Sequence, residues 1–230
     1  PYIVLSTPDV RAAARDALRT RLGNWGQACN SNKRMIVMDD IYEEFVAELV
    51  AEARKLVPGD PASRDAGIYG PLSSESAADG LAEQVAAARA GGATVHVGGE
   101  RVAGPSGGGF YVSPAVITDV EKDNRVFREE LFGPAAVVYK VSSAEEAVAL
   151  ANDSQYGLGG AVFSTDLEEA KGVADRLAVG MANVNQYAPA SPNLPFGGVK
   201  RSGFGRELGP HAVDEFANKR LYTVQGPLQG

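Results

Sequence analysis

The stretch Asn24-Trp25-Gly26-Gln27-Ala28-Cys29-Asn30 contains the only cysteine of this 230-residue chain. Gly26, three positions before Cys29, allows the backbone to turn tightly. An apolar, helix-like segment from Val10 to Leu22 precedes the stretch, and a strand-like run from Arg34 to Met38 follows it. A connection between a helix and a strand is where an α/β protein can present a nucleophile, although a lone cysteine is more often a small buried apolar residue. The remaining sequence has to decide between these two interpretations.

Strand-like and helix-like segments alternate along the rest of the chain. Strands are predicted at Tyr2–Leu5, Arg34–Met38, Thr94–Val97, Ala115–Thr118, Ala135–Val141, Gly159–Phe163 and Val179–Val184. Helices are predicted from Thr7-Pro8 to about Leu22, from Asp39 or Asp40 onward, from Ser73 or Ser74 to Gly91-Gly92, from Ser142 or Ser143 to about Asn152, and over Asp166–Leu177. Ser, Thr and Asp are common N-cap residues, and Pro is common at the first helical position. This alternation predicts an α/β fold with a mainly parallel, twisted sheet and helices on both faces.

Composition limits the class of function. The net charge of −7 and the sequence pI of about 5.0 argue against nucleic-acid binding, because no basic stripe is present to neutralise phosphates. A single cysteine excludes an internal disulfide framework and fits a reducing compartment such as the cytoplasm. The longest apolar runs are far shorter than the roughly 18–20 residues that cross a bilayer, so no membrane association is expected.

Metal and phosphate sites find little support in the sequence. One cysteine and two histidines form no metal-ligand constellation, and neither His96 nor His211 lies in an obvious partner context for Cys29. The glycine-rich segment 104–109 has no Walker lysine and no following helix. The segment 197–205 is also glycine-rich but follows no strand directly, so a dinucleotide fingerprint is not expected there.

Three stretches taken together resemble motifs of the aldehyde dehydrogenase superfamily. Gly26-Gln27-Ala28-Cys29 resembles the active-site cysteine motif of that family, and Glu129-Glu130-Leu131-Phe132-Gly133-Pro134 resembles its cofactor-facing motif. The run 195–209, Pro-Phe-Gly-Gly-Val-Lys-Arg-Ser-Gly-Phe-Gly-Arg-Glu-Leu-Gly, is similar to its C-terminal signature. The three motifs occur in the order and at the spacing of the family, and the likeness covers essentially the whole chain.

The resemblance implies a domain organisation. Residues 1–218 would form the catalytic domain, which carries the cysteine. Residues 219–230 would contribute the C-terminal strand of an oligomerisation domain, because the last strand-like run, Arg220–Val224, stands apart from the α/β alternation. The nucleotide-binding domain and the Glu-Leu-Gly-Gly motif with the general base would lie upstream and are absent from this chain. A homo-oligomer, dimer or tetramer, is therefore expected.

The resemblance also implies a reaction and roles for individual residues. Cys29 would attack an aldehyde to give a thiohemiacetal, hydride transfer to NAD or NADP would leave a thioester, and water would release the carboxylic acid. The backbone N–H of Cys29 would form half of the oxyanion hole. Glu130 would hold the nicotinamide ribose and Phe132 would pack beside the nicotinamide; the alternatives are a solvated surface glutamate and a core phenylalanine. Glu207 would be a second carboxylate that relays protons, its pKa raised by burial.

Glu207 has an equally good alternative interpretation, an ion pair with Arg206 or Lys200. In the family, the segment 183–185 ends a strand near the substrate entrance, which makes Asn185 a candidate substrate-binding residue, or one that only ties loops together. Phe196 would line the substrate channel or pack beneath it.

The segment 191–203 looks most like that of bacterial succinate-semialdehyde dehydrogenases. In those enzymes a serine of this loop hydrogen-bonds the distal carboxylate, which nominates Ser191 as substrate-binding. Several of them carry an arginine six residues before the cysteine, where this chain has Gly23, so an acidic substrate would lack one cationic partner. Arg19 and Arg21 are candidates to replace it, and spacing does not decide between them.

Two alternatives to a hydrolytic aldehyde dehydrogenase remain open from the sequence. One is a coenzyme A-acylating dehydrogenase, which passes the thioester to another thiol; Glu207 within Gly-Arg-Glu-Leu-Gly favours the hydrolytic type. The other is a non-catalytic domain that serves oligomer assembly through edge-to-edge pairing of Arg220–Val224.

Overall fold

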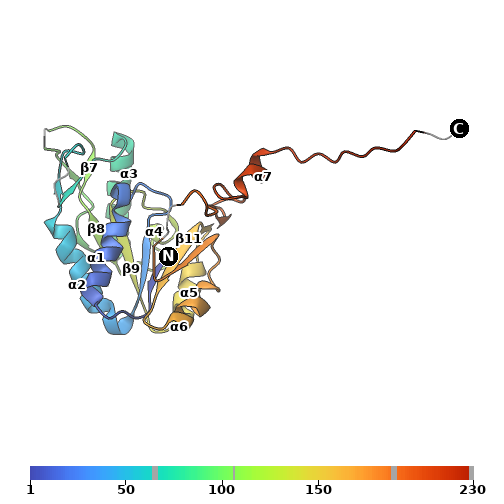
Figure 1. The fold of residues 1–230 in the computed structure, drawn as a ribbon. Coiled ribbons are helices and arrows are strands. Elements are labelled where there is room, and N and C mark those ends of the chain that lie inside the picture. The colour runs from blue at the N-terminus through green and yellow to red at the C-terminus, as the bar shows by residue number, and fades with distance from the viewer. Residues whose placement is uncertain (64–66, 106, 188–190, 228–230) are drawn as a thin grey trace.

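A computed structural model of the chain describes residues 1–63, 67–105, 107–187 and 191–227. Its centre is a seven-stranded sheet in the order β12-β11-β1-β2-β9-β8-β5, covered by helices on both faces (Figure 1). The strands of this sheet are β1 (Tyr2–Val4), β2 (Arg34–Met38), β5 (Thr94–Val97), β8 (Ala115–Thr118), β9 (Ala135–Val141), β11 (Gly159–Phe163) and β12 (Met181–Val184). All neighbouring strands run parallel except β5, which pairs antiparallel with β8 at one edge. The mainly parallel α/β fold predicted from the sequence is confirmed.

Short pairs of strands lie in the connections between the elements of the main sheet. They are β3 (Val57–Pro58) with β4 (Ile68–Tyr69), β6 (Arg101–Val102) with β7 (Tyr111–Val112), and β10 (Tyr156–Gly157) with β13 (Val199–Lys200). The β6–β7 pair flanks the glycine-rich segment 104–109, whose residue 106 lies outside the described residues.

The helices are α1 (Val10–Arg21), α2 (Asp39–Lys55), α3 (Glu75–Ala90), α4 (Arg125–Arg128), α5 (Ala144–Asn152), α6 (Leu167–Ala174) and α7 (Ala212–Phe216). Ser74, Ser143 and Asp166 cap α3, α5 and α6 with their side chains, and each lies at a predicted helix start. Within the described residues, no helix is both long and apolar enough to cross a bilayer.

Two predicted helix starts are corrected by the structure. Thr7 and Pro8 do not begin α1; Asp9 is its N-cap, because its carboxylate reaches the N–H of Ala12 at 2.9 Å. Asp39 and Asp40 do not cap α2 but occupy its first turn, where their charges face the positive end of the helix dipole.

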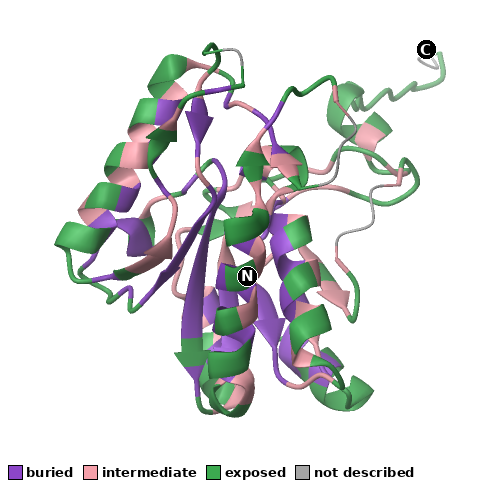
Figure 2. Cartoon of the chain, turned by 90° about the vertical axis from the view of Figure 1, so that its left-hand side faces the viewer, coloured by how far each residue is buried: buried purple, intermediate pink, exposed green. Residues whose placement is uncertain are grey.

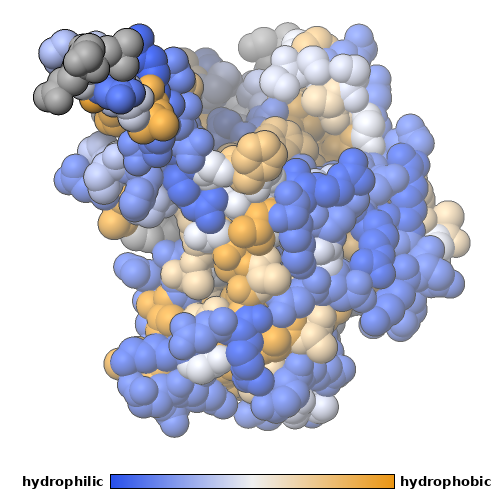
Figure 3. All heavy atoms as spheres, turned by 90° about the vertical axis from the view of Figure 1, so that its right-hand side faces the viewer, coloured by the Kyte–Doolittle hydropathy of each residue, from blue (hydrophilic) through white to orange (hydrophobic). Residues whose placement is uncertain are grey.

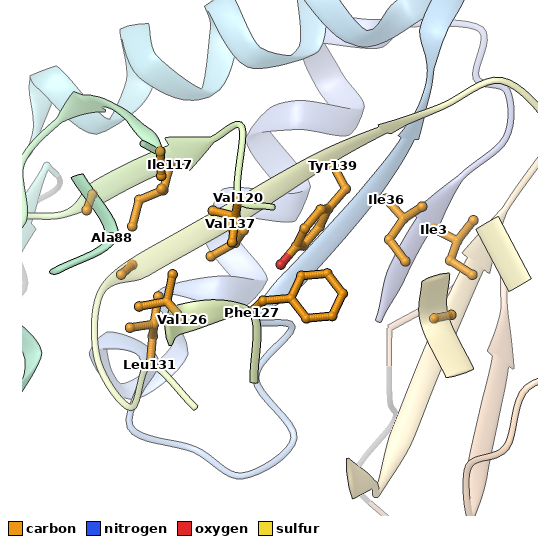
Figure 4. Close-up of a cluster of buried hydrophobic side chains, with 14 of the residues drawn as sticks. Ile3, Ile36, Ala88, Ile117, Val120, Val126, Phe127, Leu131, Val137 and Tyr139 are labelled. Atoms are coloured by element: carbon orange, nitrogen blue, oxygen red, sulfur yellow. The ribbon is translucent and has the colours of Figure 1, made fainter. Parts of the chain in front are cut away.

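Two apolar layers enclose the sheet. Successive strand residues point to opposite faces, so Ile3 and Ile36 join one layer while Met35 and Val37 join the other. The first layer packs under α3, α5 and α6, and the second packs under α1 and α2. Figure 2 shows the strands buried between helices that have exposed outer surfaces, and Figure 4 shows part of the first layer. The central strands therefore form a rigid base for the loops at their ends.

The predicted C-terminal strand has no pairing partner in the described part of this chain, and its pairing with another subunit or domain stays a prediction. Arg220–Val224 forms no strand; after α7 the described chain runs extended and exposed away from the body (Figure 1). A β-strand requires a neighbour for its backbone hydrogen bonds, and this segment has none within the described residues. Figure 3 shows that hydrophobic side chains interrupt the hydrophilic surface on the side of the molecule from which this segment extends. The division of the chain at residue 218 stays a prediction.

Candidate active site

Cys29 is exposed on a turn that leads into β2. After α1, the 3-10 turn η1 (Gly23–Gly26) is followed by a turn closed by the hydrogen bond from Ser31 N to Ala28 O at 3.0 Å. Asn24 and Trp25 have φ of 48° and 56°, a left-handed region that non-glycine residues rarely occupy. Because the thiol is exposed, the interpretation of Cys29 as a buried apolar residue is wrong.

The cavity in front of Cys29 has a volume of about 420 Å³. It is lined by the segments that precede the central strands: residues 29–34 before and at the start of β2, residues 126–131 before β9, and residues 157–161 at the start of β11. Ligands of open α/β sheets usually bind at the carboxyl ends of the strands. Here the cavity forms at the amino ends, where the Cys29 turn and the Glu130 motif meet.

The buried side chain of Arg21 connects the Cys29 turn and the Glu130 motif through hydrogen bonds. Its side chain is fully buried at the end of α1, and its guanidinium makes five hydrogen bonds without a carboxylate partner. The acceptors are Gly26 O (3.4 Å), Ser31 Oγ (2.6 Å), Leu131 O (2.6 Å), Gly133 O (2.5 Å) and Ala135 O (2.7 Å). Burial lowers the pKa of Arg21 to about 10, which leaves it protonated at neutral pH. Arg21 is therefore a structural cation and is not available to a substrate carboxylate.

The same two motifs touch through their backbones. A Cβ atom on Gly26, whose φ is +76°, would lie 2.1 Å from Gly133 O, so only glycine fits this crossing. Gln27 ties the turn to a third segment, because its Oε1 accepts from Ser73 N at 2.8 Å. The Gly and Gln of the cysteine motif are therefore explained by packing of the loop.

Glu130 lies between two cavities. It lines the Cys29 cavity and also a smaller one of about 270 Å³, which Phe132 and Gln84 of α3 share. Phe132 is 45% exposed, so it is not a core residue. A carboxylate beside an exposed ring fits the hydroxyls and the flat face of a nicotinamide riboside, and these two residues could hold that part of a cofactor.

Lys33 is a site residue that the sequence analysis missed. Its Nζ lies 2.9 Å from a carboxylate oxygen of Glu130 and 5.6 Å from the centroid of the Phe132 ring. Burial lowers the pKa of Lys33, and the hydrogen bond to Glu130 opposes that shift. The available signal was a cation four residues after the only cysteine, which is too common a pattern to single out.

The three predicted substrate residues are placed differently. Phe196 lines the cavity, as do Asn183 of β12 and Tyr187, which donates a hydrogen bond to Asn30 O. Asn185 is exposed and ties two loops, its Oδ1 accepting from Ser164 N and its Nδ2 donating to Ser164 O, both at 3.0 Å. This geometry matches the loop-tying alternative for Asn185.

Ser191 and Glu207 lie outside the residues that line the cavity. Ser191 Oγ accepts from Asn193 N at 3.4 Å. Glu207 is exposed, which contradicts the expected buried carboxylate, and its backbone pairs with that of Phe196 at 2.8 and 2.9 Å. Among the described residues Glu207 has no ion pair, because the alternative partners, Arg206 and Lys200, donate to backbone carbonyls instead.

The remaining cationic side chains of the cavity are held by protein groups. Arg34 donates to two carbonyls of α5, Arg128 to the Asp153 carboxylate at 2.5 Å, and Arg201 to the side chain of Gln155 at 2.7 Å. In the part of the chain that the structure describes, no three His, Cys, Asp or Glu side chains gather closely enough to bind a metal ion.

Comparison with known proteins identifies the class that this site defines. The model of the family described as "Aldehyde dehydrogenase family" matches residues 1–221, so the chain belongs to the aldehyde dehydrogenase family. Over its whole length it is 51% identical to a succinate-semialdehyde dehydrogenase [NADP(+)] of Deinococcus radiodurans, of which it covers 48%. The chain spans about half the length of the curated relatives it matches.

Solved structures agree with this assignment. Succinic semialdehyde dehydrogenase from Streptococcus pyogenes, in complex with NADP+, matches 97% of this chain with 48% of its own, at a TM-score of 0.89 and 39% identity. NAD-dependent aldehyde dehydrogenase from Sinorhizobium meliloti matches all of this chain with 45% of its own, at a TM-score of 0.90 and 35% identity. The resemblance seen in the three sequence motifs is thus confirmed at the level of family and fold.

Proposed function

We propose that this chain is the cysteine-bearing part of an NADP-dependent dehydrogenase that oxidises succinate semialdehyde to succinate. The observation that carries the proposal is the exposed Cys29 on a cavity that it shares with Glu130. The similarity to enzymes named succinate-semialdehyde dehydrogenase [NADP(+)] supports the substrate and the cofactor.

The chemistry begins at Cys29. Its thiolate adds to the aldehyde carbon, and the carbonyl oxygen becomes an oxyanion that accepts a hydrogen bond from the Cys29 N–H. NADP, when bound, supplies the acceptor for the hydride that leaves this carbon, so the substrate remains as a thioester on Cys29. Glu130 would hold this cofactor by accepting hydrogen bonds from its ribose hydroxyls, and Phe132 would provide a ring for the nicotinamide to pack against. Water then cleaves the thioester and restores the thiol.

Two residue roles in this scheme stay predictions. Ser191 would bind the distal carboxylate of the substrate. Glu207 would relay protons; since it is exposed, its backbone pairing with Phe196 supports a second function, that of holding this cavity residue in place.

The proposal includes a cytoplasmic homo-oligomer. Large apolar side chains between residues 204 and 224 are exposed, and a partner subunit would cover them. They are Phe204, Leu208, Val213, Phe216, Leu221, Tyr222 and Val224.

The test is acylation of the chain by an activated acetate ester, followed by intact mass and by ester turnover. We expect one acetyl group on the wild-type chain and none on Cys29→Ala. A stable acetyl-enzyme means that the nucleophile is formed and that the deacylating base lies outside this chain. Adding coenzyme A distinguishes the acylating type of dehydrogenase, which would transfer the acetyl group to the added thiol. Absence of acetylation in folded wild-type protein would refute the proposal.

A further inference from the structure

The ammonium group of Lys33 is hydrogen-bonded to the turn that carries Cys29. Its Nζ donates to the carbonyl oxygens of Ala28, Cys29 and Ser31, each at 3.3 Å. The side chain is 17% exposed and is held on its other side by Glu130. Of the cationic side chains that line the cavity in the described chain, only Lys33 bonds to this turn.

The bond to Ala28 O has a consequence for the nucleophile. The Ala28 carbonyl and the Cys29 N–H belong to one peptide group, which is planar and, as in all described peptides of this chain, not cis. In a trans peptide the C=O and the N–H point in opposite directions. By holding Ala28 O, the ammonium fixes the direction of this C=O bond, and with it the opposite direction of the Cys29 N–H, away from Lys33.

Other parts of the turn do not hold this peptide plane. Arg21 bonds to Gly26 O and Ser31 Oγ, which flank the turn, and Gln27 anchors the segment before it. The Ala28 carbonyl accepts from Ser31 N at 3.0 Å, a bond within the turn that rotates with it. Lys33, tied to Glu130 at 2.9 Å, provides the contact to a separate segment of the fold.

We propose that Lys33 is a positioning residue for the oxyanion hole: it aims the Cys29 N–H at the oxygen of the reacting carbonyl. The inference rests on the proposed function of Cys29 as the nucleophile. It adds a residue whose ammonium does not itself touch the reacting atoms but orients the donor that does.

The experiment compares two reactions of the same thiol. Acylation by an activated acetate ester passes through an oxyanion and needs the N–H donor, whereas alkylation by iodoacetamide displaces iodide and forms no oxyanion. Because Cys29 is the only cysteine, both rates report on it alone. Removal of one oxyanion-hole donor typically costs a factor of about 100–1,000 in rate, and a misdirected donor should cost a tenth of that or more.

For Lys33→Met we expect acylation to fall at least about tenfold, and alkylation at pH 7 to fall by no more than about threefold, from loss of a nearby positive charge. Lys33→Arg, which keeps the charge and the N–H donors, should recover most of the acylation rate. The control is Lys140→Met, which removes an exposed lysine paired with Glu43 far from the site and should change neither rate.

The outcomes separate the two proposals. If wild-type chain is alkylated but not acylated, the proposed function of Cys29 fails. If wild-type acylates and Lys33→Met lowers both rates equally, or neither, the positioning role of Lys33 is refuted while Cys29 stands. Should Lys33→Met fail to fold, Lys33→Gln, which keeps two N–H donors without a charge, takes its place. Its ratio of acylation rate to alkylation rate is expected to lie between the wild-type ratio and a tenfold lower one.

Discussion

Arg21→Met tests whether the buried guanidinium holds the Cys29 turn and the Glu130 motif together. The substitution keeps a similar apolar stem and removes every donor. It strands three carbonyl oxygens, those of Gly26, Leu131 and Ala135, in a region where the arginine itself is fully buried. Gly133 O keeps its bond from Ala135 N at 2.7 Å.

The magnitude follows from these contacts. At about 1 kcal/mol for each stranded carbonyl, the loss is about 3 kcal/mol. The mutant also lacks the desolvation cost of a buried cation, and relaxation admits water to some carbonyls, so we expect a net destabilisation of about 2 kcal/mol. Ser31 adds little, because its hydroxyl also donates to Arg21 O, a backbone bond that the substitution leaves intact.

The assay is urea unfolding followed by two signals. Circular dichroism reports the whole fold, and fluorescence reports Trp25, which is the only tryptophan and lies within the same stretch as Cys29. Arg19→Met is the matched control, since Arg19 lies on the same helix and its side chain is 76% exposed. It forms an ion pair with Asp16, a contact worth at most about 1 kcal/mol. A loss of less than about 1 kcal/mol in Arg21→Met would refute the role assigned to Arg21.

Three further outcomes are expected. Gly26→Ala should destabilise the chain by at least about 2 kcal/mol in urea unfolding, because the residue has positive φ and its Cβ would overlap Gly133 O; a neutral result would contradict the backbone crossing. Gly172→Ala, in open space within α6, should instead stabilise it by about 0.5–1 kcal/mol, and a loss would show that the helix is not formed there. Burial raises the pKa of Tyr187 from 10.0 to about 12, so between these values the folded chain retains a proton that the unfolded chain has lost, and stability should fall as the pH rises. Thermal unfolding across this range should show a smaller fall for Tyr187→Phe, and an equal fall would remove Tyr187 from the explanation.

The order of strands and helices could be predicted because its signals are local. Ala135–Val141 is a continuous apolar run of the kind that a strand covered on both faces requires, and the structure places β9 over these residues. Ser74 and Ser143 were recognisable as helix starts because a cap acts on N–H groups two or three residues away. Thr7 and Asp9 compete for the same role, and only the backbone path decides in favour of Asp9.

The Arg220–Val224 strand stays a prediction for a different reason. A β-propensity pattern describes one side of a pairing, and the other side must come from elsewhere in the fold or from a partner. Nothing within residues 220–224 contains that information.

The sequence by itself determined the α/β element order, the family through three motifs, and Cys29 and Glu130 as the residues to examine. Only the tertiary structure decided that the site forms at the amino ends of the central strands, that Arg21 is buried beneath it, and that Lys33 bridges the Cys29 turn and Glu130. The physical reason is distance along the chain. Arg21 and Gly133 are 112 residues apart, and the role of a cation depends on which carbonyls and carboxylates the fold brings to it, which no local pattern of residues encodes.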